Sequence, residues 1–127
     1  MHERLPSRGE IWDVDWSPGR GSEQVGRRPA LVVQNDHGNH SLRYPSTIVV
    51  AVSRHGRPIP FHVRIDAGPD SGLAASSWAK CEQVLTVAKD RLGAAPRGRV
   101  SPETMRKVDR ALLLSLGIDP SAALEEG

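Results

Sequence analysis

Two arginines stand where a polar connection meets a hydrophobic run, and this position suggests phosphate chemistry. Arg27, Arg28 and Pro29 close the glycine-rich segment 17–29, which has no apolar periodicity, and residues 30–34 follow with the composition of a strand. A guanidinium at such a junction would be fixed beside a long connection, and its planar fork can bind a phosphate through two hydrogen bonds. Arg28 is therefore a candidate phosphate-binding residue.

Other side chains with chemical potential lie further along the chain. Ser53 ends the apolar run 47–52 and would offer its hydroxyl at a rigid position. His55 and His62 could form an acid–base pair for cleaving RNA, because imidazoles titrate near neutral pH. The sequence alone does not show whether these groups meet in space.

The sequence indicates no metal and no cofactor. His37 and His40 have the spacing of helical metal ligands, but the intervening glycine and the surrounding turn residues disfavour a helix, and no third ligand is indicated. The single cysteine, Cys81, cannot form an intrachain disulfide or a CxxC site, and we expect it to be a small buried side chain. Phosphate-loop, GxSxG, HExxH and dinucleotide motifs are absent from the sequence.

Length and charge set the wider limits. A chain of 127 residues fits one domain, residues 1–127, with a real core. Its net charge is only +2, but arginine supplies 14 of the 17 basic residues, which makes nucleic acid a plausible partner. The apolar runs are strand-sized and the first residues lack the apolar region of a secretory leader, so we expect a cytoplasmic protein without a membrane segment.

The hydrophobic pattern predicts mostly strands and one helix. Alternation or β-branched composition indicates strands at residues 11–16, 30–34, 47–52, 61–65, 72–78 and 81–87. Met105, Val108, Leu112 and Leu116 recur at helical spacing, Ser101 offers an N-cap, and Gly117 a stop. Short strands separated by glycine and proline turns favour a small β-barrel, which the helix would cover.

These segments together resemble a known family, the MazF/PemK endoribonuclease toxins of bacterial toxin–antitoxin modules. The resemblance is carried by the loop GSEQVGRRP at 21–29, the strand LVVQND at 31–36, Gly38 with Asn39, the strand that ends at Ser53, the blocks EQV at 82–84 and KDRL at 89–92, and the helix 105–117. It covers residues 8–117, which we take as the core, and leaves residues 118–127 as an expected tail.

The resemblance implies a fold, an activity and partners. The fold would be an SH3-like barrel of the PemK/CcdB type with a C-terminal helix, acting as a homodimer. Its activity would be metal-independent, sequence-specific cleavage of single-stranded RNA by 2′-hydroxyl attack, giving 2′,3′-cyclic phosphate and 5′-hydroxyl ends. A cognate MazE-like antitoxin would inhibit it. The family's catalytic arginine falls on Arg28, and its catalytic threonine on Ser53, where serine lacks the methyl group that restricts the threonine rotamer.

Substrate binding would fall to polar residues around this pair. The resemblance assigns it to Ser22, Glu23, Gln24, Asn39 and Gln83, whose side chains could bond the exposed edges of unpaired bases. The segment 54–60 is shorter and more proline-bounded than expected for the family, so the cleavage motif is not predicted.

Two alternatives remain open at this point. One is a non-catalytic protein on the same barrel, either a protein inhibitor of a topoisomerase or a degenerate toxin that binds RNA without cutting it. The other is a nuclease that uses His55 and His62 as acid and base, in which case mutation of either histidine abolishes cleavage.

Overall fold

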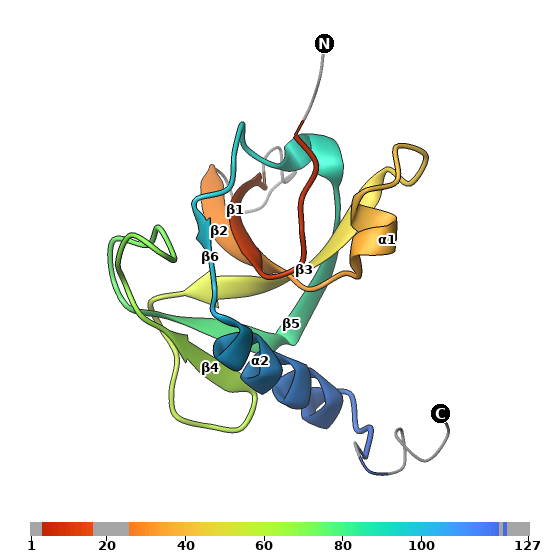
Figure 1. Cartoon of the computed structure of the whole chain (residues 1–127). Coiled ribbons are helices and arrows are strands. Elements are labelled where there is room, and N and C mark those ends of the chain that lie inside the picture. The colour runs from red at the N-terminus through yellow and green to blue at the C-terminus, as the bar shows by residue number, and fades with distance from the viewer. Residues whose placement is uncertain (1–3, 17–25, 120, 122–127) are drawn as a thin grey trace.

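The protein is a curled antiparallel sheet with one long helix packed against it (Figure 1). The computed structural model describes residues 4–16, 26–119 and 121. The elements are, in chain order, β1 (Glu10–Asp15), β2 (Arg27–Val32), α1 (Asp36–Asn39), β3 (Ser46–Ser53), β4 (His62–Ile65), β5 (Ser77–Ala88), the 3-10 turn η1 (Lys89–Arg91), β6 (Gly98–Arg99) and α2 (Pro102–Ser115).

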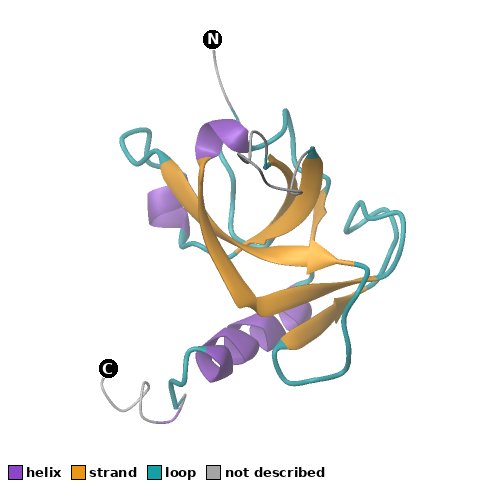
Figure 2. Cartoon of the chain, turned by 180° about the vertical axis from the view of Figure 1, so that it is seen from behind, coloured by secondary structure: helices purple, strands orange, loops and turns teal. Residues whose placement is uncertain are grey.

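The sheet has six strands in the order β4-β5-β3-β2-β1-β6, and every neighbouring pair is antiparallel. It bends into a half-barrel, and α2 lies across β4 and β5, as both views show (Figures 1 and 2). This is the small β-barrel with a C-terminal helix that the sequence predicts. No helix among the described residues is long and apolar enough to cross a membrane.

Two apolar clusters occupy the two faces of the sheet. The larger lies beneath α2 and joins residues of every strand except β6 to Val108 and Ala111 of the helix. The smaller lies on the concave face and consists of Trp12, Val14, Ala30, Val32, Val49 and Val87. Trp12 and Val14 alternate along β1, as the sequence pattern predicts. The smaller cluster forms the floor beside the site described below.

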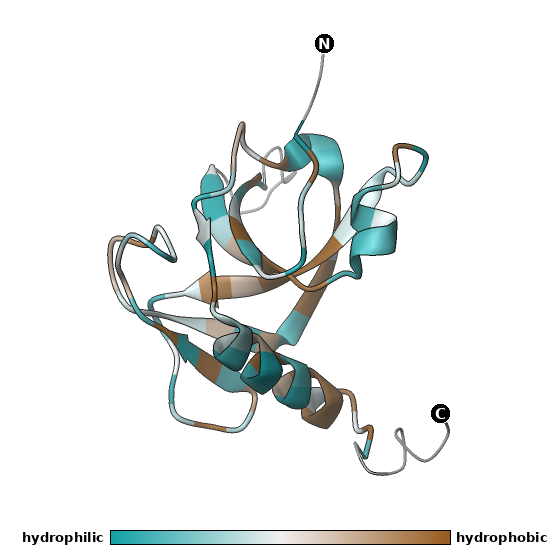
Figure 3. Ribbon diagram, viewed as in Figure 1, coloured by the Kyte–Doolittle hydropathy of each residue, from teal (hydrophilic) through white to brown (hydrophobic). Residues whose placement is uncertain are grey.

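Helix α2 begins and ends at the predicted signals. The Ser101 side chain accepts a hydrogen bond from the Thr104 backbone N–H at 3.1 Å, and Gly117 closes the helix with φ of +76°. The predicted apolar stripe holds for Val108, which is fully buried, but not for Leu116, which is 62% exposed. The hydrophobic end of the helix therefore faces solvent (Figure 3).

The structure corrects two predicted elements. The strands expected at 72–78 and 81–87 are replaced by one strand, β5, which begins at Ser77 and runs without a break to Ala88. Residues 68–72, up to the start of the first expected strand, form a turn, in which the Gly72 N–H donates to the Gly68 carbonyl at 2.8 Å. The segment around His37 and His40, where the sequence disfavours a helix, contains the short helix α1. Asn35 caps its start, and Lys89, distant in sequence, donates to the carbonyls of Gly38 and Ser41 at its end. Local propensity could not include that long-range contact.

Candidate active site

Strands β2 and β3 bring Arg28 and Ser53 together. Their antiparallel register pairs Ala30 with Ala51 and Leu31 with Val50, so the same register continued by two residues sets Arg28 opposite Ser53. Both residues lie on the concave face, because Arg28 shares its face with Ala30 and Ser53 shares its face with Val49. Neighbouring strands thus place a cation and a hydroxyl side by side on one face of the sheet.

The paired ladder between the two strands stops at Ala30, and Pro29 gives the reason. The Val33 N–H donates to the Ile48 carbonyl at 2.9 Å, so odd-numbered residues of β2 point their backbone groups toward β3. Pro29 belongs to this set but has no N–H to donate. Pro29 can still accept a hydrogen bond through its carbonyl, but it cannot donate the bond that would continue the ladder to Arg28 and Ser53.

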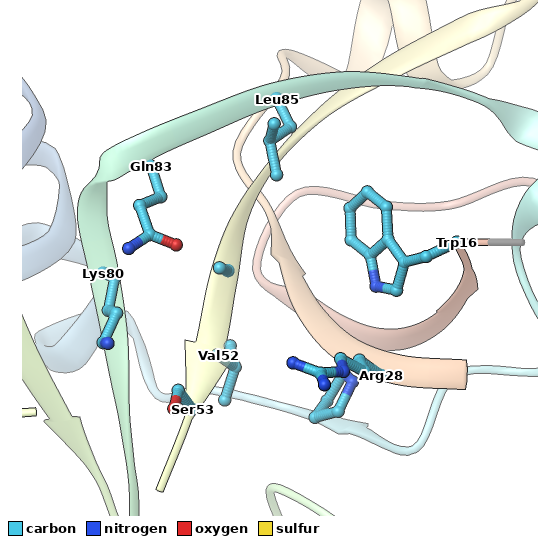
Figure 4. A pocket seen from close by; sticks show the side chains of 9 residues that line it. Trp16, Arg28, Val52, Ser53, Lys80, Gln83 and Leu85 are labelled. Atoms are coloured by element: carbon cyan, nitrogen blue, oxygen red, sulfur yellow. The ribbon is translucent and has the colours of Figure 1, made fainter. Parts of the chain in front are cut away.

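A groove of about 330 Å³ opens at this place. Figure 4 shows the Arg28 guanidinium extending into it toward the side of Ser53 and Lys80. The residues that line it come from the end of β1 and from β2, β3 and β5, namely Trp16, Arg28, Pro29, Ala51, Val52, Ser53, Lys80, Gln83 and Leu85. Two of these described lining residues are cationic and none is acidic, so the groove favours an anionic ligand.

Arg28 is free to bind that ligand, unlike Arg8 and Arg97. Arg97 is paired with Asp13 at 2.6 Å, and Arg8 is paired with Asp109. Within the described residues, no side chain or carbonyl forms a hydrogen bond or ion pair with the Arg28 guanidinium. Its donors therefore remain available for a phosphate.

The Ser53 hydroxyl is held in place by the backbone that follows it. Its Oγ accepts a hydrogen bond from the His55 N–H at 3.0 Å, in a turn that immediately follows β3. This contact restricts the side-chain rotamer without the methyl group that a threonine would supply. Because Oγ is the acceptor, the hydroxyl proton stays free to be donated.

An irregularity in β5 places Lys80 and Gln83 on the same groove. Val50 pairs with Val84 but the next residue of β3, Ala51, pairs with Lys80, so residues 81–83 have no partner on β3. Such bulges bend a strand and redirect its side chains, and they are frequent beside active sites. Helix α2 supports this one, since the Ser115 hydroxyl donates to the Cys81 carbonyl at 2.9 Å.

Sequence reasoning identified Gln83 and missed Lys80. Lys80 fell in the gap between the predicted strands 72–78 and 81–87, and the bulge that turns it toward the groove leaves no local signature. The only available signal was rarity, because Lys80 is one of three lysines in the chain.

Asn39 has a structural position that does not support its predicted role in binding RNA. Its side chain is fully buried, and its oxygen accepts from Gln34 Nε2 at 3.0 Å and from the Thr47 hydroxyl at 2.7 Å. Its amide nitrogen donates to the Gln34 carbonyl and to Asp36. An amide with all its hydrogen-bonding groups satisfied in the interior has none left for a base, and we correct its role to holding α1 against β2 and β3.

Both ring nitrogens of His62 are also engaged in contacts within the protein. Its side chain is 6% exposed, Nδ1 accepts from the Arg57 N–H at 3.2 Å, and Nε2 lies 3.1 Å from Glu82 Oε2. Partial burial alone would raise the pKa of Glu82, but its hydrogen bonds with His62 and with its own backbone outweigh this and lower that pKa. An imidazole with both nitrogens engaged is poorly placed to exchange protons with a substrate.

Three predicted RNA-binding residues, Ser22, Glu23 and Gln24, lie outside the described residues. His37 and His40 do lie in the described part of the chain, and no group of three or more potential metal-binding side chains is found there.

The geometry defines a class of protein, a small antiparallel barrel whose concave face ends in an open cationic groove suited to a phosphodiester strand. Sequence similarity identifies the family. The family model described as the PemK-like, MazF-like toxin of type II toxin–antitoxin systems matches residues 7–116. The chain belongs to this toxin family.

Characterised relatives agree with that membership. Endoribonuclease MazF9 of Mycobacterium tuberculosis is 40% identical over 115 residues, which cover 87% of this chain and 96% of that protein. Endoribonuclease EndoA of Bacillus subtilis is 41% identical over 116 residues, covering 90% and 97%. A solved mycobacterial endoribonuclease in complex with its cognate antitoxin is 28% identical, with a TM-score of 0.71 over 90% of this chain and 97% of that one. The family, fold and enzyme class predicted from the sequence are confirmed.

Proposed function

We propose that this toxin-family endoribonuclease acts in the cytoplasm and cuts single-stranded RNA at short sequence motifs without a metal ion. The substrate's 2′-hydroxyl attacks the adjacent phosphorus, and the bond from phosphorus to the 5′-oxygen breaks, leaving a 2′,3′-cyclic phosphate and a 5′-hydroxyl. The observation that supports this proposal is the register that sets the unpaired Arg28 opposite the oriented hydroxyl of Ser53 in a cationic groove.

Arg28 acts as the electrostatic catalyst. The transition state carries more charge on the non-bridging phosphate oxygens than the diester does, so a fixed cation that contacts them lowers the barrier. A guanidinium stays protonated in proteins and can donate two hydrogen bonds at once. The same group is placed to assist the leaving 5′-oxygen as negative charge develops on it.

Ser53 donates a hydrogen bond to the phosphate or to the attacking hydroxyl. The His55 N–H uses one of the two lone pairs on the Ser53 oxygen, and the hydroxyl proton remains available for this hydrogen bond. Lys80 adds a second positive charge on the β5 side of the groove.

The remaining lining residues fit the bases rather than the phosphate. The ring of Trp16 and the side chain of Leu85 give the groove apolar walls, and the Gln83 amide offers both a donor and an acceptor. Unpaired bases of RNA are bound through stacking and through their exposed edges, and the groove offers side chains suited to both kinds of contact. We propose Gln83 as a base-contacting residue together with Ser22, Glu23 and Gln24.

Cleavage of end-labelled RNA tests the proposal. Purified protein in excess EDTA is expected to cut a pool of varied single-stranded sequences and to leave 5′-hydroxyl ends. Arg28→Ala should lower kcat by about 10² to 10³, the usual cost of removing one transition-state donor. Arg27→Ala is the matched control, because Arg27 precedes Arg28 on the opposite face of β2, and it should cut at nearly the normal rate.

Three outcomes would contradict the proposal. Intact RNA across all sequences would refute the proposed activity. Undiminished cutting by Arg28→Ala would refute the catalytic role of Arg28, and loss of cutting in EDTA would show that the reaction needs a metal ion. RNA that is bound tightly but left whole would point to the non-catalytic alternative.

We propose a second copy of the chain as the first partner. Residues 82–86 of β5 are exposed in succession, with Val84 and Leu85 each 39% exposed, and the end of α2 leaves Leu114, Leu116 and Ile118 in solvent. Burial of such apolar surface stabilises association by about 25 cal/mol per Å². Sedimentation equilibrium should show a dimer that Leu116→Glu weakens, and a monomer at every concentration would refute this partner.

The second proposed partner is a cognate antitoxin. An acidic, partly apolar segment would complement the groove of Arg28 and Lys80 and would displace RNA. Titration of the toxin with the product of a neighbouring gene should inhibit cleavage in proportion to RNA displacement. Inhibition with RNA still bound would argue against shared use of the groove.

A further inference from the structure

The imidazole of His62 joins the connection that follows Ser53 to the bulge of β5 that carries Gln83, and Ser53 and Gln83 both line the groove. On one side, its Nδ1 accepts a hydrogen bond from the Arg57 N–H in the connection that follows Ser53. On the other side, its Nε2 contacts Glu82 in the bulge of β5 that also carries Gln83. One nearly buried side chain thus links the backbone after the hydroxyl group to the strand that faces the substrate.

The hydrogen bonds define the protonation of this ring. A backbone N–H can only donate, so Nδ1 must be unprotonated, and the proton of the neutral ring then lies on Nε2, which donates to the carboxylate. Trp78 lies beside the ring, with centroids 6.4 Å apart, and Gly56 lies so close to Trp78 that an added Cβ would stand 2.4 Å from its ring. The segment around His62 is therefore packed as well as hydrogen-bonded.

Glu82 retains capacity for a further contact. Its side chain is 39% exposed, and a carboxylate has about four lone-pair positions, of which His62 and the backbone N–H of Glu82 itself use two. A carboxylate can accept hydrogen bonds from the amino groups of cytosine, adenine or guanine but not from uracil O4. A neighbour that fixes its orientation would determine which base edge it meets.

We propose that His62 is a positioning residue for RNA recognition, which holds the Glu82 carboxylate toward an amino-bearing base. This inference rests on the proposed function and adds to it a specificity-determining residue, Glu82, and the group that orients it. His62 does not touch the phosphate and exchanges no proton with it. The two residues act as one unit on base choice and leave the chemical step to Arg28 and Ser53.

The tautomer provides a test that needs no RNA. Long-range ¹H–¹⁵N spectra of the wild-type protein near neutral pH should show one histidine ring with a protonated Nε2 and an unprotonated Nδ1. Glu82→Gln should keep this tautomer, because the Arg57 N–H still points at Nδ1. A ring protonated on Nδ1, or one that averages freely between tautomers, would overturn the inference.

Cleavage of a randomised RNA pool, with sequencing of the 5′-hydroxyl ends, tests the functional unit. Glu82→Gln and His62→Asn should relax the base preference by about tenfold at one and the same nucleotide position. His62→Gln should retain most of that preference, because its amide nitrogen can take the place of Nε2. Combining Glu82→Gln with His62→Asn should add little beyond either change alone. His37→Ala, an exposed histidine on α1, is the matched control and should leave the profile unchanged.

Kinetics separate positioning from catalysis. On the preferred RNA, His62→Asn should raise KM about tenfold and change kcat less than about threefold. Equal loss of kcat at every site, or altered preference at a position that Glu82→Gln leaves unaffected, would overturn the inference while the proposed function stands. If the wild-type protein cuts no RNA, the proposed function is refuted, and this inference is refuted with it because it rests on that function.

Discussion

Replacement of Asn39 by alanine gives the sharpest test of a role read from the structure. The change removes four hydrogen bonds of 2.7 to 3.1 Å in the interior. Gln34 Nε2 keeps its hydrogen bond to the Ser46 carbonyl. The fully buried Thr47 hydroxyl loses its acceptor, and the Gln34 carbonyl loses the hydrogen bond from the Asn39 amide nitrogen. Each buried polar group left unpaired costs about 1–3 kcal/mol, so the free energy of unfolding should fall by about 2 to 5 kcal/mol.

Such a loss is large against the total stability of a domain, which is about 5–15 kcal/mol. It should appear as a lower midpoint in urea at an unchanged slope and as a fall in Tm of roughly 10 °C. His37→Ala on the same helical turn is the control, because its exposed side chain should change stability by less than about 0.5 kcal/mol.

The cleavage assay then distinguishes structure from recognition. Below the melting range, the folded Asn39→Ala protein should bind and cut RNA with nearly unchanged KM and base preference. Unchanged stability together with weaker RNA binding would refute the reasoning and return Asn39 to the substrate-binding set.

Three further predictions concern single side chains. Ser53→Ala should lower kcat about 10- to 100-fold while Ser53→Thr keeps activity, and equal rates for all three proteins would remove the hydroxyl from the mechanism. Burial, together with the charges of Glu82 and Asp109, raises the pKa of Cys81 to about 12, so a thiol reagent at pH 8 should label it only after unfolding; rapid labelling of the native protein would contradict this. The pKa of Glu82 is lowered in the folded protein, so its ionised carboxylate stabilises the fold at pH values above the ordinary pKa of 4.5. This stabilisation is lost as the pH falls through the pKa of the folded state, so Glu82→Gln should make the free energy of unfolding depend less on pH in the acid range. A curve identical to wild type would show that the carboxylate is not coupled to folding.

The local sequence was sufficient for the elements that position the proposed catalytic pair. Alternation located β1, a β-branched apolar run located β3, and the Arg-Arg-Pro sequence placed Arg28 close to the start of β2. The capping residues of α2 predicted its start and its end, because they act within one helical turn. Each of these features depends on neighbours in sequence.

What the sequence could not show depends on contacts between distant residues. The bulge that brings Lys80 to the groove arises from pairing with β3 and β4 and from the Ser115 hydroxyl on α2. Asn39 looked like an exposed turn residue because its partner Thr47 lies on another strand. His62 looked like a possible acid or base until its two hydrogen bonds, to Arg57 and Glu82, were visible.

The proline that ends the ladder between β2 and β3 has a structural consequence. Arg28 is carried by β2, which pairs with β1, and Ser53 by β3, which pairs with β5, and Pro29 cannot donate the backbone hydrogen bond that would continue the ladder between β2 and β3 to this pair. Beyond Ala30 and Ala51 the ends of the two strands are therefore joined by fewer backbone hydrogen bonds than the paired positions before them. The proposed catalytic pair consequently stands at the end of the ladder, and the groove opens where the ladder stops.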